Sequence, residues 1–206
     1  MRIYCVEQNY MTHKREKENH VDKDLLLFQK PENALYPTGE TYTFTNFDEC
    51  KLFCQAELIL KISKGGKSIS REQASSHLES MTTGINFTSI NIHDELNGIV
   101  VPWEEVKAWP GSSLIGIWSP ASEFRNLSDL NFCLYKNREM VQLGNSELMI
   151  HDIYDIIAEV SKQFELEEGD LIFTGTPSGI GEVFEGDKLE AFTEDDSVLE
   201  FEIGGK

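Results

Sequence analysis

The run KLFCQAELILKIS, residues 51–63, constrains the fold more than any other stretch of the chain. Hydrophobic side chains recur there at every second position: Leu52, Cys54, Ala56, Leu58, Leu60 and Ile62. Successive side chains of a β-strand point to opposite faces, so this pattern predicts a strand with one buried face. The intervening positions face the other way, and they place Gln55 and Glu57 next to each other on that second face.

Short strands separated by turns dominate the rest of the chain. Strands are predicted at 83–92, 171–175, 188–192 and 197–205, and residues 25–36 read as a strand followed by a turn broken by proline. Helices are predicted at 70–82, with Ser70 as N-cap, and at about 147–164, with Ser146 as N-cap. The charged segment 11–24 reads as the start of a short helix or as a loop. Few helices among many strands indicate a β-rich α+β domain.

The charge of the chain is strongly acidic, with 18 basic residues against 36 acidic ones and a net charge of −18. This disfavours binding to nucleic acids or to anionic membranes. The N-terminus does not read as a signal peptide, and no stretch approaches 18 apolar residues. The four cysteines lack the spacing of a disulfide framework or a zinc site, so we expect reduced thiols and a cytoplasmic protein.

A glycine-rich segment near the C-terminus, GDLIFTGTPSGIG at 169–181, is the most distinctive motif. It lacks the lysine that ends a phosphate-binding P-loop. Its glycines allow the backbone to pass close to another group, and Thr174 and Thr176 supply hydroxyls. Free backbone N–H groups in such a turn suit an oxyanion or a carboxylate. A plain connection between two strands is the alternative reading.

This segment resembles the signature of the fumarylacetoacetate hydrolase family. Three further stretches resemble the same family in the same order: EQNYMTHKRE at 7–16, LFQKPENAL at 27–35, and GINFTSINIHDELNGIVVPWEEVKAW at 84–109. The resemblance covers about residues 3–204. It implies one domain over 1–206, with an N-terminal segment and lid at 1–45 and a core at 46–206. It also implies mixed sheets rolled around a central site, and a homodimer.

The resemblance further implies chemistry at C–C bonds of 2-oxo or 1,3-diketo acids, assisted by Mg²⁺ or Mn²⁺. The family holds its ion on a Glu-x-Glu pair and an Asp. Those positions here are Gln55, Glu57 and Asn86, so two of the three carboxylates are replaced by amides. Amide oxygens ligate hard cations without the charge that offsets the dehydration of Mg²⁺. We therefore expect weak metal binding.

Positions around the expected metal site depart from the family pattern as well. Ile90 stands at the position of an arginine and Asn91 at that of an aspartate, while His93 replaces a glutamine that touches the substrate. Losing the arginine removes a fork that binds carboxylates. His93 and His13 could instead join Glu57 around a softer metal such as zinc, although a lone histidine is more often structural or solvated.

Other positions keep the family pattern. His13 and Glu16 match its acid–base pair, and Lys107 matches a lysine that stabilises a developing oxyanion. Thr176, beside Gly175, matches a threonine that meets the carboxylate of the substrate. Each match has a structural alternative. His13 and Glu16 could belong to a charged surface turn, Lys107 could be an ordinary surface lysine, and Thr176 could supply a hydroxyl to a turn.

Two functions from different classes follow. The first is an enzyme for small oxo- or diketo-acids whose metal-dependent activity is weak or absent. The second is a non-catalytic protein that binds a small acid or a partner on the same scaffold. The altered positions favour the second reading, and the retained His13, Glu16, Lys107 and Thr176 favour the first. A metal-free reaction is a third reading that no residue pattern specifies.

Overall fold

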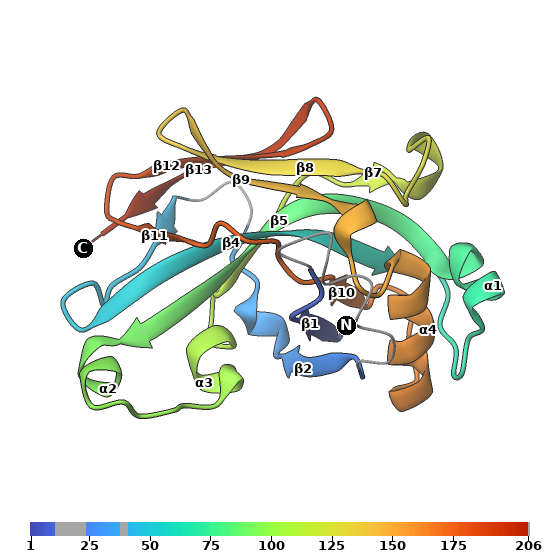
Figure 1. Cartoon of the computed structure of the whole chain (residues 1–206), viewed down its shortest axis with the longest axis horizontal. Coiled ribbons are helices and arrows are strands. Elements are labelled where there is room, and N and C mark those ends of the chain that lie inside the picture. The colour runs from blue at the N-terminus through green and yellow to red at the C-terminus, as the bar shows by residue number, and fades with distance from the viewer. Residues whose placement is uncertain (11–23, 38–40, 206) are drawn as a thin grey trace.

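Two β-sheets pack face to face across a hydrophobic core in the computed structural model, which describes residues 1–10, 24–37 and 41–205 (Figure 1). Within these residues the larger sheet has eight strands, six of them in the order β2-β1-β10-β4-β5-β6, and the smaller sheet has five, in the order β3-β13-β12-β8-β9. The larger sheet comprises β1 (Ile3–Glu7), β2 (Leu26–Lys30), β4 (Cys50–Ile62), β5 (Leu78–Asn91), β6 (Ser113–Ile115), β7 (Ser119–Pro120), β10 (Leu171–Phe173) and β11 (Gly181–Val183). The smaller sheet comprises β3 (Tyr42–Thr43), β8 (Asn131–Lys136), β9 (Glu139–Asn145), β12 (Lys188–Thr193) and β13 (Asp196–Gly204).

The helices are α1 (Arg71–Ala74), α2 (Ile92–Leu96), α3 (Trp103–Lys107) and α4 (Ile153–Gln163), with 3₁₀ turns at Glu32–Ala34, Ser75–His77, Ala121–Glu123 and Ser146–Leu148. Helices α1, α2 and α4 lie at the ends of the larger sheet, whereas α3 lies on the side of that sheet that turns away from the smaller one (Figure 1). The predicted β-rich α+β class is confirmed. None of the helices in the described residues is long and apolar enough to cross a membrane.

Strand β4 confirms the predicted alternating pattern. All six of its predicted core positions are at most 1% exposed and belong to the main hydrophobic cluster between the sheets. On its other face, Ile59 joins a second cluster with Cys5, Phe28 and Phe173. Gln55 and Glu57 share that second face, which points away from the smaller sheet.

Strand β5 is longer than predicted, and the helix before it is shorter. Ser70 is the N-cap of α1, as predicted, and forms a capping box with Gln73, but the helix ends at Ala74. The predicted helical extent to residue 82 is wrong, because Leu78 already pairs with Ile62 in the β4–β5 ladder. Pairing along a long strand overrides the local helical pattern here.

The predicted start of the second long helix is also wrong. Helix α4 begins at Ile153, where the side chain of Asp152 accepts hydrogen bonds from two first-turn N–H groups. The hydroxyl of Ser146 instead binds the backbone of the loop at 127–130. Between the two, Met149 forms a β-bridge with Tyr10, which holds this stretch extended.

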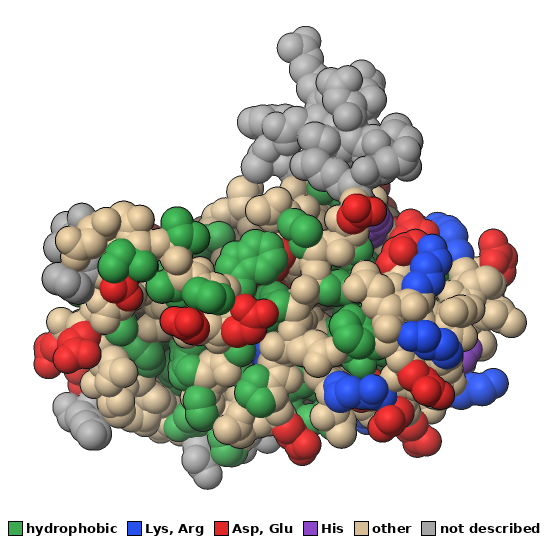
Figure 2. All heavy atoms as spheres, turned by 90° about the horizontal axis from the view of Figure 1, so that it is seen from below, with side chains coloured by type: hydrophobic (Ala, Val, Ile, Leu, Met, Phe, Trp, Pro, Cys, Tyr) green, Lys and Arg blue, Asp and Glu red, His purple; other side chains and the backbone are tan. Residues whose placement is uncertain are grey.

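The face of the larger sheet that turns away from the smaller one is seen in Figure 2. Lysine and arginine side chains gather there at the end that carries α1 and α4, while hydrophobic side chains are spread over the remainder. Among the described residues, the surface cations of this view therefore lie mainly at one end of the face.

Candidate functional site

The three positions matched to the family's metal ligands lie together on adjacent strands. Gln55 of β4 stands directly opposite Asn86 of β5, and Glu57 opposite Gly84, in an antiparallel register. Gln55 is 5% exposed, Glu57 1% and Asn86 0%. The structure thus brings these three side chains into one buried cluster, although it does not test their assignment as ligands.

Both carboxylate oxygens of Glu57 accept hydrogen bonds from the protein. Asn86 Nδ2 donates to Oε1 at 2.7 Å, and the backbone N–H of Gly175 donates to Oε2 at 2.8 Å. Burial, and secondly the carboxylate of Glu7, raise the pKa of Glu57 to about 7. The charges and donors around it, Lys107 first, oppose this shift.

Lys30 fixes the orientation of the Asn86 amide. Its ammonium donates to Asn86 Oδ1 at 2.8 Å, and an ammonium can only donate, so the NH₂ end of Asn86 must face Glu57. Lys30 also donates to Ser113 Oγ at 2.7 Å and to the hydroxyl and carbonyl oxygens of Ser112, each at 3.2 Å. Burial lowers the pKa of Lys30 to about 8.

Lys107 is the second buried cation of the site. It is the last residue of α3, whose Trp103 packs against Phe28 of the second hydrophobic cluster. The ammonium of Lys107 donates to Gln55 Oε1 at 2.7 Å and forms an ion pair with Glu7 at 2.9 Å. The lysine matched to the family's oxyanion position therefore contacts the strand that carries the expected metal ligands.

The loop at 174–181 wraps closely around β4. Gly175 has φ of +89°, and an added Cβ would lie 3.1 Å from both Asn9 Cβ and the carbonyl of Val6, so only glycine fits there without strain. Thr176 donates its hydroxyl to the carbonyl of Ala56 at 2.8 Å. Its role in holding a substrate carboxylate remains a prediction, and in this structure its hydroxyl proton is donated to β4.

Two residues outside the predicted site, Gln142 and Asn9, hold this loop in place through hydrogen bonds. Gln142 of β9 accepts from the N–H of Ala56 at 2.8 Å and donates to Thr176 Oγ1 at 2.7 Å and to the carbonyl of Pro177 at 2.9 Å. Asn9, which follows β1, donates to the carbonyls of Thr174 and His151. The loop is thus fixed from both sheets.

Sequence reasoning also missed Glu7 and Lys30 as members of the site. Lys30 lies in the Lys-Pro turn that carried part of the family resemblance, so a signal for it existed. Glu7 ends β1 and precedes the Asn-Tyr pair, but its neighbours in sequence give no reason to place it on Lys107. That contact arises only when β1 and α3 meet.

Several other predicted residues cannot be placed relative to this network, because they are not among the described residues. His13 and Glu16 lie in 11–23, outside the described residues, as does the side chain of His93. Ile90 lies near the end of β5 opposite Lys51. Their predicted roles stay predictions.

The oxygen donors do not fit a hard divalent cation in this arrangement. A cation on Glu57 would need an oxygen from Asn86, yet Asn86 turns its N–H toward Glu57 while Lys30 holds its oxygen. Reversing the amide would place its N–H against the ammonium of Lys30. Within the described part of the chain, no group of three or more His, Cys, Asp and Glu residues could hold a metal ion.

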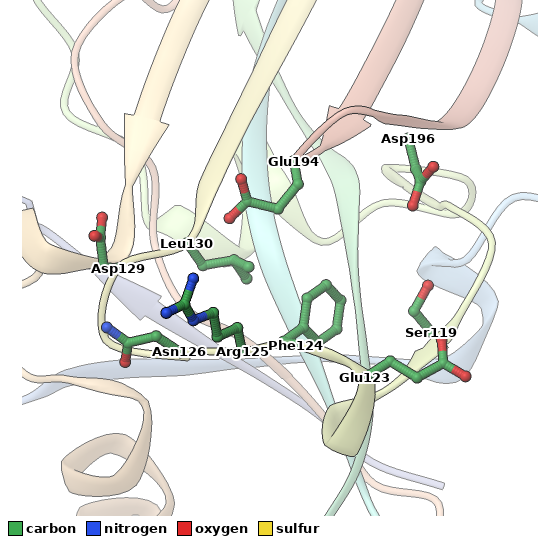
Figure 3. Close-up of a pocket in the computed structure, with 9 residues that line it drawn as sticks. All are labelled: Ser119, Glu123, Phe124, Arg125, Asn126, Asp129, Leu130, Glu194 and Asp196. Carbon is green, nitrogen blue, oxygen red and sulfur yellow. The ribbon is translucent and has the colours of Figure 1, made fainter.

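A hollow of about 680 Å³ lies elsewhere, among loops at the edge of the smaller sheet (Figure 3). Glu123, Asp129, Glu194 and Asp196 line it together with a single guanidinium, that of Arg125. Four carboxylates against one cation repel an acidic ligand. This hollow is therefore a poor candidate for binding a small acid.

Facing sheets with a buried, mixed-charge cluster on one face of the larger sheet define a protein of the fumarylacetoacetate hydrolase fold. The family profile described as "Fumarylacetoacetate (FAA) hydrolase C-terminal" matches residues 2–206, and the chain belongs to this family.

Similar proteins agree with this assignment. The oxaloacetate tautomerase FAHD1, mitochondrial, of Bos taurus is 31% identical over 92% of this chain and 85% of its own length. The oxaloacetate tautomerase YcgM of Escherichia coli K12 is 30% identical over 91% of this chain and 86% of its own length. A fumarylpyruvate hydrolase of Pseudomonas aeruginosa, solved in complex with Mn²⁺ and pyruvate, has a TM-score of 0.84 at 29% identity, over 100% of this chain and 90% of that chain.

Proposed function

We propose that this chain binds a small 2-oxo or 1,3-diketo acid on the family scaffold, and that its metal-dependent chemistry at C–C bonds is weak or lost. The observation that carries the proposal is the Asn86 amide, held between the ammonium of Lys30 and the carboxylate of Glu57. Hydrogen bonds within the protein satisfy the oxygens that would otherwise surround an ion.

Two ammonium groups supply the positive charge that an acidic ligand needs. Lys107 and Lys30 are 6% and 4% exposed, and charge-assisted hydrogen bonds from buried donors are stronger than those formed in water. The names of the relatives point to oxaloacetate, fumarylpyruvate and pyruvate as the first ligands to examine. If turnover remains, His13 and Glu16 would move the proton and Lys107 would stabilise negative charge.

Calorimetric titration with Mg²⁺ and Mn²⁺, with and without oxalate as an enolate mimic, tests the proposal. We expect no metal binding by the native protein at millimolar concentrations. A Kd in the micromolar range, about −8 kcal/mol, would contradict the lost metal site. Turnover of oxaloacetate by the native protein at the rate of an active relative would contradict the lost activity.

The double variant Gln55→Glu, Asn86→Asp provides the matched comparison. It restores both carboxylates, and we expect it to bind Mn²⁺ at least about 100-fold more tightly than the native chain, because carboxylates are the preferred ligands of hard cations. If it gains oxaloacetate turnover as well, the native site is a disabled enzyme. Metal binding without turnover would favour the other function considered for this chain, a non-catalytic protein that binds a small acid.

We also propose a homodimer, as the resemblance implies. Light scattering coupled to size-exclusion chromatography measures this directly, and a mass of about 23 kDa at micromolar protein would contradict it.

A further inference from the structure

Glu7 is a charged residue of the site to which no role has been assigned. It is the last residue of β1, and its carboxylate lies 2.9 Å from the ammonium of Lys107. The side chain of Glu7 is 15% exposed and that of Lys107 is 7% exposed, so water screens this pair poorly.

An opposite charge is one way to stabilise a buried ammonium, and position 55 does not provide one. Gln55 Oε1 accepts a hydrogen bond from Lys107 at 2.7 Å, but an amide offers only a dipole. Among the described residues, Glu7 is the carboxylate in direct contact with Lys107. Glu57 is near enough to interact electrostatically with both residues, since Lys107 lowers its pKa and Glu7 raises it.

We propose that Glu7 is the positioning residue of Lys107, and that it supplies the carboxylate charge that position 55 no longer carries. This inference rests on the proposed function, in which Lys107 binds an acidic ligand without a metal ion. Glu7 and Gln55 together take two of the three N–H donors of the ammonium. They thereby set the direction of the third, which has no hydrogen-bond partner among the described residues and is the donor that we assign to an oxygen of the ligand.

The loss of Glu7 would free Lys107 to turn toward Glu57. An oxo-acid would then meet an ammonium already paired with another carboxylate. Conversely, a glutamate added at position 55 would place two carboxylates on one ammonium and a third, Glu57, next to them on the same strand face. A carboxylate at 7 and a carboxylate at 55 are therefore alternatives in this site, and each is tolerated best when the other is absent.

Four proteins test this idea: the native chain, Glu7→Gln, Gln55→Glu and the double variant. Urea unfolding should show that each single change lowers the folding equilibrium constant by at least about tenfold, and that the double variant lies within about threefold of the native chain. If the folding equilibrium constant of the double variant falls by the product of the factors seen for the two single variants, the two positions are independent and the proposal is wrong. Should Glu7→Gln fail to fold, the proposal still requires the double variant to be more stable than Gln55→Glu.

Oxalate and pyruvate binding, measured by calorimetry in the presence of EDTA, separates positioning from simple charge. We expect Glu7→Gln to bind at least about tenfold more weakly and the double variant to regain most of that loss. Tighter binding by Glu7→Gln would show that Glu7 merely competes with the ligand, and would overturn the positioning role. If the native protein binds neither acid, the proposed function fails. The unfolding data still decide whether a carboxylate at position 7 can replace one at position 55.

Glu79→Gln is the matched control, because it removes the same charge from the exposed pair with Lys61 at the other end of β4. The side chains there are 43% and 33% exposed. We expect both readouts to stay within about threefold of the native chain. An equal loss in this control would attribute the Glu7 effect to net charge alone.

Discussion

The two buried lysines of the site are stabilised by different kinds of partner. Lys107 lies against the carboxylate of Glu7, whereas the direct partners of Lys30 are the neutral oxygens of Asn86, Ser112 and Ser113. In keeping with this, the pKa of Lys30 is lowered to about 8, with burial as the main cause. The difference shows that a cation can be held inside this fold either by an opposite charge or by a shell of dipoles, and the two should respond differently to mutation.

Removal of each lysine in turn should give the largest effect. Lys107→Met leaves the carboxylate of Glu7 without its cation, and breaking a buried ion pair from one side costs about 3–5 kcal/mol. Lys30→Met leaves only neutral acceptors without a donor, and should cost about 1–3 kcal/mol. Urea unfolding midpoints at constant slope measure both losses.

The control for this comparison is Lys61→Met, whose partner Glu79 is exposed. It should cost less than about 1 kcal/mol, since surface pairs contribute little. A Lys30→Met loss equal to or greater than that of Lys107→Met would mean that the dipolar shell holds its cation as firmly as the carboxylate does. The contrast between the two lysines would then disappear.

The pH dependence of stability should separate the same groups at a smaller scale. The pKa of Lys30 falls from 10.5 to about 8 on folding, so the unfolded chain binds more protons between these values, and stability should rise with pH across that window. The pKa of Glu57 rises from 4.5 to about 7, so the stability contributed by its protonated form should be lost as pH rises through 7. Together they predict a stability minimum near pH 7–8.

The contribution of Lys30 can be isolated by measuring the free energy of unfolding of the native chain and of Lys30→Met from pH 4.5 to 10.5. The difference should grow in favour of the native chain above pH 8, by at most about 3 kcal/mol. The same comparison with Glu57→Gln isolates the loss of stability that Glu57 causes as pH rises toward 7. A difference that does not change with pH would place Lys30 in a better solvated environment than its burial indicates.

Strands β4 and β5 were predictable from the chain because their signal is repeated. Every second position of β4 from Leu52 to Ile62 is hydrophobic, and the partner strand β5 has the β-branched content to match. Strands β1, β8 and β9 were not among the predicted strands. Helix ends were not predictable, because tertiary partners decide them. Ser146 is as good an N-cap residue as Asp152, but its hydroxyl is taken by the loop at 127–130.

Some residues of the site could likewise be predicted from the sequence, and others could not. Gln55, Glu57 and Asn86 could be placed together from the motif, since two adjacent strands supply them. Glu7 and Gln142 could not, because each reaches the site from a distant part of the chain through side-chain contacts that no local pattern encodes. Glu7 lies 48 residues before Gln55 in sequence, and Gln142 lies 86 residues after Ala56.

The smallest expected change in stability comes from removing single neutral hydrogen-bond partners of Lys30. Ser113 Oγ is its closest partner at 2.7 Å, whereas Ser112 Oγ lies at 3.2 Å and is accompanied by the Ser112 carbonyl. Ser113→Ala should therefore cost about 1–2 kcal/mol, where the ranges for a hydrogen bond between neutral groups and for one to a charged group meet, and Ser112→Ala should cost less. Urea unfolding of the two variants ranks them. The reverse order would mean that the longer contacts carry the shell, and equal, negligible losses would mean that Asn86 alone is sufficient to hold the ammonium.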